Sequence, residues 1–137
     1  MQDHTKPRLV QGEVAIATIR SHNLYGTDDP GKPRPVVLLR PAGRSGWLIM
    51  GLTTLPAYTD GTPRIPIADP HGAGLNGPGY LWGNPCTLPT DNITSHLGWC
   101  HERLIADIAA LADLDDGTVA RMTLASNAER AREEATA

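Results

Sequence analysis

Short apolar runs alternate with turn-forming stretches over the first hundred residues of the chain. In residues 13–20, Val14 and Ile16 fall on one face and Ala15 and Ile19 on the other, which predicts a largely buried strand. Val36–Leu39 and Trp47–Leu52 are continuous apolar runs bounded by Pro and Gly, as in core strands. Shorter strands are predicted at 64–67 (an edge strand), 80–82, 86–88 and 95–99.

The hydrophobic period changes after residue 101. Leu104, Ile105, Ile108 and Leu111 fall at helical spacing, which predicts a helix of about 14 residues ending near residues 115–117. Residues 117–137 are rich in Ala, Arg and Glu and predict a second helix, either a docking arm or a solvated appendage. We therefore expect a polar lead-in at 1–10, one domain at 11–116 and a helical tail at 117–137.

The composition favours a β-rich domain over a helical bundle, because 137 residues include 14 Gly and 12 Pro but no Phe. Residues 1–8 have no signal-peptide core, and no run approaches the length of a membrane span. We expect a cytoplasmic protein without a membrane partner. The formal net charge of −3 gives no global attraction to nucleic acid, so RNA binding would require a local basic patch.

A proline-stiffened loop runs into the strand that begins near Val36. Pro33 and Pro35 restrict the backbone on either side of Arg34, so its guanidinium leaves the chain at a defined place. Arg34 could clamp an anion such as phosphate, or it could simply face water at the strand end. If the two core strands pair as an antiparallel hairpin, Thr53 comes close to Arg34. Its hydroxyl could serve a site or satisfy nearby backbone groups.

Several other polar residues are candidates for chemistry. The loop at 21–33 is long enough to act as a binding loop, and its His22 is a candidate general base because imidazole titrates near neutral pH. Four basic residues could gather into an RNA-binding patch: Lys32, Arg40, Arg44 and Arg64. The set Cys86, His96, Cys100 and His101 lacks the spacing of a zinc site, so we expect free thiols and no metal.

Residues 11–114 resemble the MazF/PemK (Kid-like) toxins of bacterial toxin–antitoxin pairs. The segments that carry the resemblance are Gly12-Glu13-Val14, Gly26–Gly31, Arg34-Pro35-Val36-Val37-Leu38, Leu52-Thr53, Asn84-Pro85-Cys86-Thr87 and Leu97-Gly98. The chain departs from the family at Gly83, where some members carry an acid, and at Cys86, where the family has Arg.

The resemblance implies a small SH3-like β-barrel (MazF/PemK/CcdB-like) with a C-terminal helix, followed here by an extra helical tail. It also implies a homodimer that cleaves single-stranded RNA at short motifs without metal or cofactor and is blocked by a cognate antitoxin. Family active-site residues correspond to Arg34, which would stabilise the phosphorane, and Thr53, which would orient the phosphate or sugar. The alternative is a non-catalytic protein of this fold that binds or inhibits a protein partner.

Overall fold

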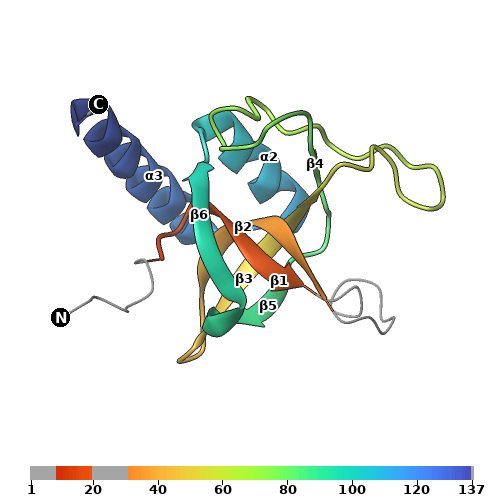
Figure 1. Cartoon of the computed structure of the whole chain (residues 1–137), viewed down its shortest axis with the longest axis horizontal. Helices are drawn as coiled ribbons and strands as arrows, with labels where there is room; N and C mark the ends of the chain where they lie inside the picture. The colour runs from red at the N-terminus through yellow and green to blue at the C-terminus, as the bar shows by residue number, and fades with distance from the viewer. Residues whose placement is uncertain (1–8, 20–30, 137) are drawn as a thin grey trace.

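A curved antiparallel sheet forms the body of the protein, and two helices pack on one side of it (Figure 1). The computed structural model describes residues 9–19 and 31–136. A 3-10 turn, η1 (Thr90–Asn92), joins two of the strands. In chain order, the strands and helices are β1 (Glu13–Ile19), β2 (Lys32–Ala42), β3 (Gly46–Thr53), β4 (Tyr80–Leu81), β5 (Cys86–Pro89), β6 (Ile93–Trp99), α2 (Glu102–Ala112) and α3 (Asp116–Thr136).

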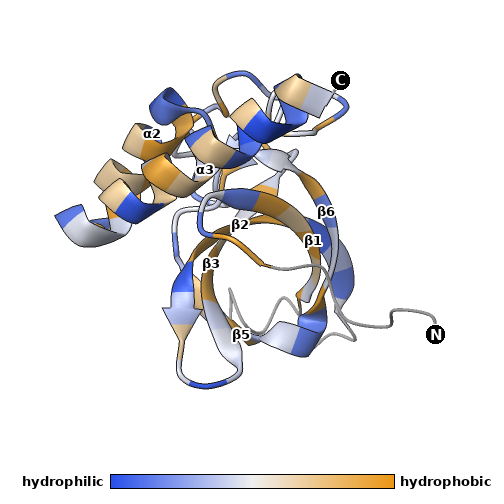
Figure 2. Ribbon diagram, turned by 90° about the vertical axis from the view of Figure 1, so that its left-hand side faces the viewer, coloured by the Kyte–Doolittle hydropathy of each residue, from blue (hydrophilic) through white to orange (hydrophobic). Residues whose placement is uncertain are grey.

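The strands follow the order β4-β3-β2-β1-β6, and β5 pairs with the first half of β3. Figure 2 shows β1, β2, β3 and β5 curving around a common interior. The sheet is not closed into a barrel within the described residues, because the chain passes from β5 through η1 to β6 and these two strands do not pair. The prediction of a mainly β fold with a C-terminal helix is confirmed, whereas the closed SH3-like barrel is not.

The main strands match the apolar runs, but β2 is longer than its run. It begins at Lys32 and continues through both prolines, which pair with β1 as Pro33↔Thr18 and Pro35↔Ile16. Proline cannot donate a backbone hydrogen bond, and the β2–β3 ladder ends at Val36↔Gly51, the pair next to Pro35. The two strands therefore separate at this end of the sheet.

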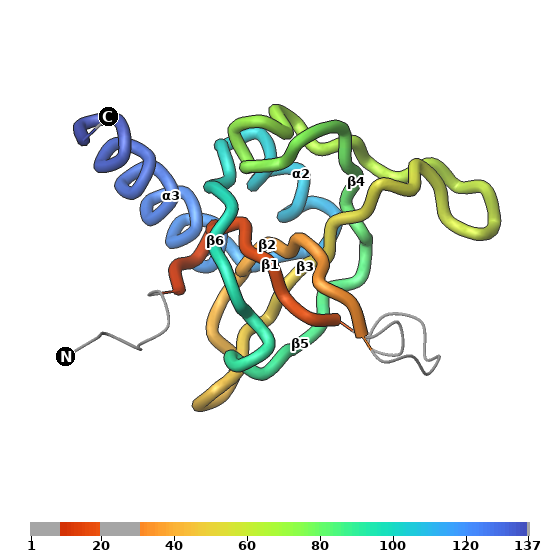
Figure 3. Tube along the Cα trace, in the orientation of Figure 1, coloured from red at the N-terminus to blue at the C-terminus, as the bar shows by residue number. Residues whose placement is uncertain are grey.

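The prediction of an edge strand at 64–67 was wrong. Within the described residues it forms only an isolated bridge, Pro66↔Tyr80, although the Leu81 amide also donates to the Ile65 carbonyl. A second hydrogen bond flanks the bridge, from the Ile67 amide to the Gly79 carbonyl at 2.8 Å, and the pairing extends no further among the described residues. The long irregular segment between β3 and β4 is visible in Figure 3 as the yellow and green loop that extends away from the sheet.

Apolar side chains are buried on both faces of the sheet. The inner core lies inside the curve and consists of residues from strands only, including Val36, Leu38 and Ile49. On the other face, the helix-side core packs strand residues against Leu104, Ile105 and Ile108 of α2. Because consecutive residues point to opposite faces, the continuous apolar run in β2 fills both cores at once.

The helix that follows β6 ends earlier than predicted. α2 has 11 residues and stops at Asp113, whose φ of 54° places it in the left-handed conformation. Asp115 then caps the N-terminus of α3, because its carboxylate accepts hydrogen bonds from the Thr118 amide at 3.0 Å and the Thr118 hydroxyl at 2.6 Å. The helical prediction for the tail is confirmed over Asp116–Thr136.

α3 packs against the sheet and is not a solvated appendage. Met122 is fully buried in the helix-side core, and Trp99 Nε1 donates to Glu133 Oε2 at 2.7 Å. The chain at Gly12, red in Figure 3, passes close to α3 at Ser126. Neither helix in the described part of the chain is long and apolar enough to cross a membrane.

Candidate functional site

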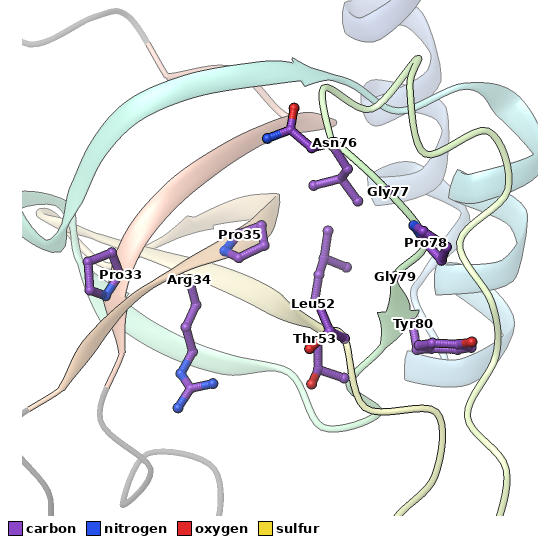
Figure 4. A pocket seen from close by; sticks show the side chains of 12 residues that line it. Pro33, Arg34, Pro35, Leu52, Thr53, Asn76, Gly77, Pro78, Gly79 and Tyr80 are labelled. Atoms are coloured by element: carbon purple, nitrogen blue, oxygen red, sulfur yellow. The ribbon is translucent and has the colours of Figure 1, made fainter.

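A pocket of about 720 Å³ lies at the end of the sheet where β2 and β3 separate. Beyond Val36↔Gly51, β3 leaves β2 and pairs with β4 through Leu52↔Leu81 and Thr53↔Tyr80. The ends of β2 and β3 form one wall, and the segment that leads into β4 forms the other (Figure 4). The lining residues are Pro33, Arg34, Pro35, Leu52, Thr53, Thr54, Leu75, Asn76, Gly77, Pro78, Gly79 and Tyr80.

The structure brings Arg34 and Thr53 into the same pocket. Arg34 continues the alternation of Val36 and Leu38, and Thr53 lies two residues beyond Gly51, the last residue of β3 that pairs with β2. Figure 4 shows Arg34 extending from β2 and Thr53 at the end of β3. Thr53 Oγ1 also accepts a hydrogen bond from the Leu55 amide at 3.2 Å, so the hydroxyl serves the local turn while its proton stays available to donate.

Arg34 is the one charged residue among the described residues that line the pocket. Its Cζ lies 5.2 Å from the centroid of the Trp82 ring, and its Nε is buried without a hydrogen-bond partner among the described residues. No carboxylate of the described ranges forms a salt bridge with it. Because a guanidinium keeps its charge at any pH at which the protein folds, the pocket has a fixed cation at its edge.

The four residues of the predicted basic patch do not gather together. Lys32 is exposed, two residues before Arg34 on β2, and Arg64 is buried beside Trp82. Arg40 and Arg44 are exposed at the opposite end of the hairpin. The reason is the extended backbone of β2, in which the six residues from Arg34 to Arg40 span about 20 Å.

The predicted general base, His22, lies outside the described residues. None of the twelve lining residues is acidic, and the structure explains why Gly83 carries no acid. The Gly83 amide donates to the Tyr58 hydroxyl at 3.2 Å, and a Cβ at this position would collide with that hydroxyl. A carboxylate at residue 83 therefore requires Tyr58 to move.

Both cysteines are free thiols, as predicted. Burial raises the pKa of Cys100 to about 12 and also raises the pKa of Cys86 above its ordinary value, so both thiols are protonated at neutral pH. Within residues 9–19 and 31–136, no group of three or more His, Cys, Asp or Glu side chains is arranged to hold a metal ion.

Sequence reasoning missed the arrangement of Trp82, Arg64 and Tyr58 behind Arg34. Arg64 Cζ lies 4.4 Å from the Tyr58 ring centroid and 5.6 Å from that of Trp82. The sequence shows the arginine and aromatic residues themselves. Which arginine lies over which ring depends on the path of the irregular segment from 54 to 79, which the sequence pattern does not fix.

The pocket combines a fixed cation, a hydroxyl donor and a half-buried aromatic ring, Tyr80. Such a set can bind the phosphate of a flexible chain through Arg34 and stack a neighbouring ring on Tyr80. No protein-family model, no curated protein and no solved structure matches this chain.

Proposed function

We propose that the protein is a MazF/PemK-like, metal-independent endoribonuclease that cleaves single-stranded RNA at short motifs. The observation that carries the proposal is that Arg34 and Thr53 line one pocket where β2 and β3 separate, with no carboxylate of the described residues paired to the arginine. This juxtaposition supports the role that the resemblance assigns to the same two residues.

In the proposed reaction the RNA supplies its own nucleophile. The 2′-hydroxyl attacks the adjacent phosphorus, the bond from phosphorus to the 5′-oxygen breaks, and the departing 5′-oxygen takes a proton from solvent, which regains the proton of the 2′-hydroxyl. The products carry a 2′,3′-cyclic phosphate and a 5′-hydroxyl. Arg34 stabilises the negative charge that develops on the phosphorane, which removes the need for a metal ion. Thr53 donates a hydrogen bond to the phosphate or sugar, and His22 is the candidate base that accepts the 2′-hydroxyl proton.

The biological setting is part of the same proposal. The protein acts in the cytoplasm as a homodimer with an SH3-like fold, and a cognate antitoxin blocks the pocket. A cation without a described acidic partner suits an acidic, partly disordered antitoxin segment, because binding would pair that charge. Lys32, which is exposed, adds a second cation at the same end of β2.

The test is cleavage of a long single-stranded RNA in excess EDTA by wild-type protein and two site variants. Arg34→Ala and Thr53→Val should each reduce cleavage by at least about 100-fold, as expected for a lost transition-state contact. Arg40→Ala removes an exposed arginine from the other end of the same strand, and Thr87→Val removes an exposed strand threonine. Both control variants should cleave at the wild-type rate. Equal loss in site and control variants would contradict the assignment.

A second candidate function is binding of a protein partner without catalysis. It is favoured by the apolar lining of the pocket, which includes three prolines, and by Leu55, which follows the lining residue Thr54 and is 58% exposed. This candidate would be supported over the nuclease if folded wild-type protein cuts no RNA but binds a partner protein, and if Leu55→Asp no longer binds that partner.

A further inference from the structure

Two arginine side chains share the ring of Trp82 behind the pocket. Arg34 Cζ lies 5.2 Å from the ring centroid and Arg64 Cζ lies 5.6 Å from it. Arg64 also lies over Tyr58, with 4.4 Å between its Cζ and that ring centroid. We call Trp82, Arg64 and Tyr58 the supporting stack. Each guanidinium–ring distance is within the range of a cation–π interaction.

The supporting stack is anchored to the backbone around it. The Trp82 amide donates to the Gly51 carbonyl at 2.9 Å, and a Cβ at residue 51 would lie 3.3 Å from Cε3 of the indole. Glycine at this position therefore allows the ring to lie close against β3. Arg64 is only 6% exposed, and its Nη1 donates to the Leu55 carbonyl at 3.0 Å. These contacts fix the indole from the side of the sheet and from the side of the loop.

The two arginine charges in this arrangement have no acidic partner among the described residues. Neither Arg34 nor Arg64 forms a salt bridge with an acid of residues 9–19 or 31–136. Because Arg64 is buried, its charge is screened less by solvent than that of a surface arginine. The faces of Trp82 and Tyr58 provide the partial negative charge that offsets it. An anion at Arg34 would also be attracted by Arg64, so the second charge favours an anionic ligand in the pocket.

We infer that Trp82 and Arg64 are positioning residues that hold the Arg34 guanidinium in place for a phosphate of single-stranded RNA. This inference rests on the proposed function in that Arg34 is taken as the phosphate-binding group. Arg34 is a half-buried side chain with several rotatable bonds, and its described contact through the guanidinium is the one with Trp82. Loss of the ring would leave the charge in the pocket but free its position.

The first test observes Arg34 directly by NMR of its Nε–Hε group, assigned from its loss in Arg34→Lys. In wild-type protein the ring current of Trp82 should shift the Hε resonance from the usual arginine position. Trp82→Leu should return it to that position, and Trp82→Phe should keep part of the shift. Trp47→Phe, which alters a buried ring at the other end of β3, should leave it unchanged. An unchanged Arg34 resonance in folded Trp82→Leu would overturn the inference.

The second test measures binding of a 2′-O-methyl oligonucleotide, which cannot be cleaved because it has no free 2′-hydroxyl. Trp82→Leu and Arg64→Met should each weaken binding about tenfold. In an Arg34→Ala background, Trp82→Leu should have no further effect, since it acts through Arg34. An equal effect in both backgrounds would overturn the inference, and so would wild-type protein that binds no oligonucleotide. If Trp82→Leu weakens binding only when Arg34 is present but the protein cleaves no RNA, the result would contradict the nuclease function and leave this inference standing.

Discussion

Gly12→Ala tests whether α3 is an integral part of the domain. Gly12 has φ +89°, and both of its backbone polar groups are hydrogen bonded. Its amide donates to the Leu38 carbonyl at 2.8 Å, and its carbonyl accepts from the Cys100 amide at 2.9 Å. A Cβ at residue 12 would collide with the Ser126 hydroxyl and lie 2.9 Å from the Met122 carbonyl oxygen. The backbone cannot shift freely, so α3 must move.

The magnitude has two parts. An alanine at positive φ costs about 1 kcal/mol relative to glycine, and forcing a methyl group into a filled contact costs about 1–3 kcal/mol more. Gly61→Ala isolates the first part, because Gly61 has φ +86° and a Cβ at this residue would meet no atom within 4 Å. We expect Gly61→Ala to lower the free energy of unfolding by about 1 kcal/mol and Gly12→Ala by about 2–4 kcal/mol.

Urea unfolding followed by far-UV circular dichroism measures both losses. Adding Ser126→Ala to Gly12→Ala removes the hydroxyl but leaves the Met122 carbonyl in place, so it should recover part of the lost stability. Equal losses for Gly12→Ala and Gly61→Ala would refute the packing of α3 against Gly12.

Three further predictions concern single interactions. Glu133→Leu removes the acceptor of the Trp99 indole and should lower the free energy of unfolding by about 1 kcal/mol. Glu133→Gln keeps an acceptor oxygen and should retain most of the wild-type stability, as urea titration would show. Because burial raises the pKa of Cys100 to about 12, its thiol stays protonated in the folded state while the unfolded thiol ionises near pH 9. Stability should therefore fall from pH 9 toward pH 12, and less so in Cys100→Ala, as thermal melts can measure. Hydrogen bonds from Thr118 lower the pKa of Asp115, so this carboxylate stabilises the fold above its unfolded pKa. Asp115→Ala should lower Tm at pH 7, and the difference from wild type should shrink as the pH falls through the carboxylate's folded pKa. A pH-independent difference would contradict this.

The hairpin that carries Arg34 and Thr53 was predictable because its information is local. The apolar runs of β2 and β3 are separated by a short glycine-containing turn, which sets an antiparallel register. That register brings the end of β3 to the start of β2 without any knowledge of the rest of the fold, and the bulge between Leu38 and Arg40 shifts it by one residue. The extension of β2 through Pro33 and Pro35 was not predictable, since proline usually indicates a loop, and only pairing with β1 shows that the backbone continues as a strand.

The surroundings of the site depend on contacts between distant parts of the chain. Arg64 and Trp82 belong to segments predicted only as short strands, and their approach to Arg34 follows from tertiary packing. The docking of α3 has the same origin: its buried Met122 falls in a helix whose sequence is polar, and Gly12 gave no sign that a helix about 110 residues later would pack on it. The scattered positions of Arg40 and Arg64 could not be read from charge alone.

The most direct test of the nuclease is incubation of wild-type protein with a long single-stranded RNA in excess EDTA, followed by analysis of the product ends. The account predicts cuts at a few short sites, with 2′,3′-cyclic phosphate on one product and 5′-hydroxyl on the other. A single 2′-deoxy substitution before a cut site should abolish that cut. Intact RNA after incubation with folded protein, or cleavage that persists at the 2′-deoxy position, would contradict the account.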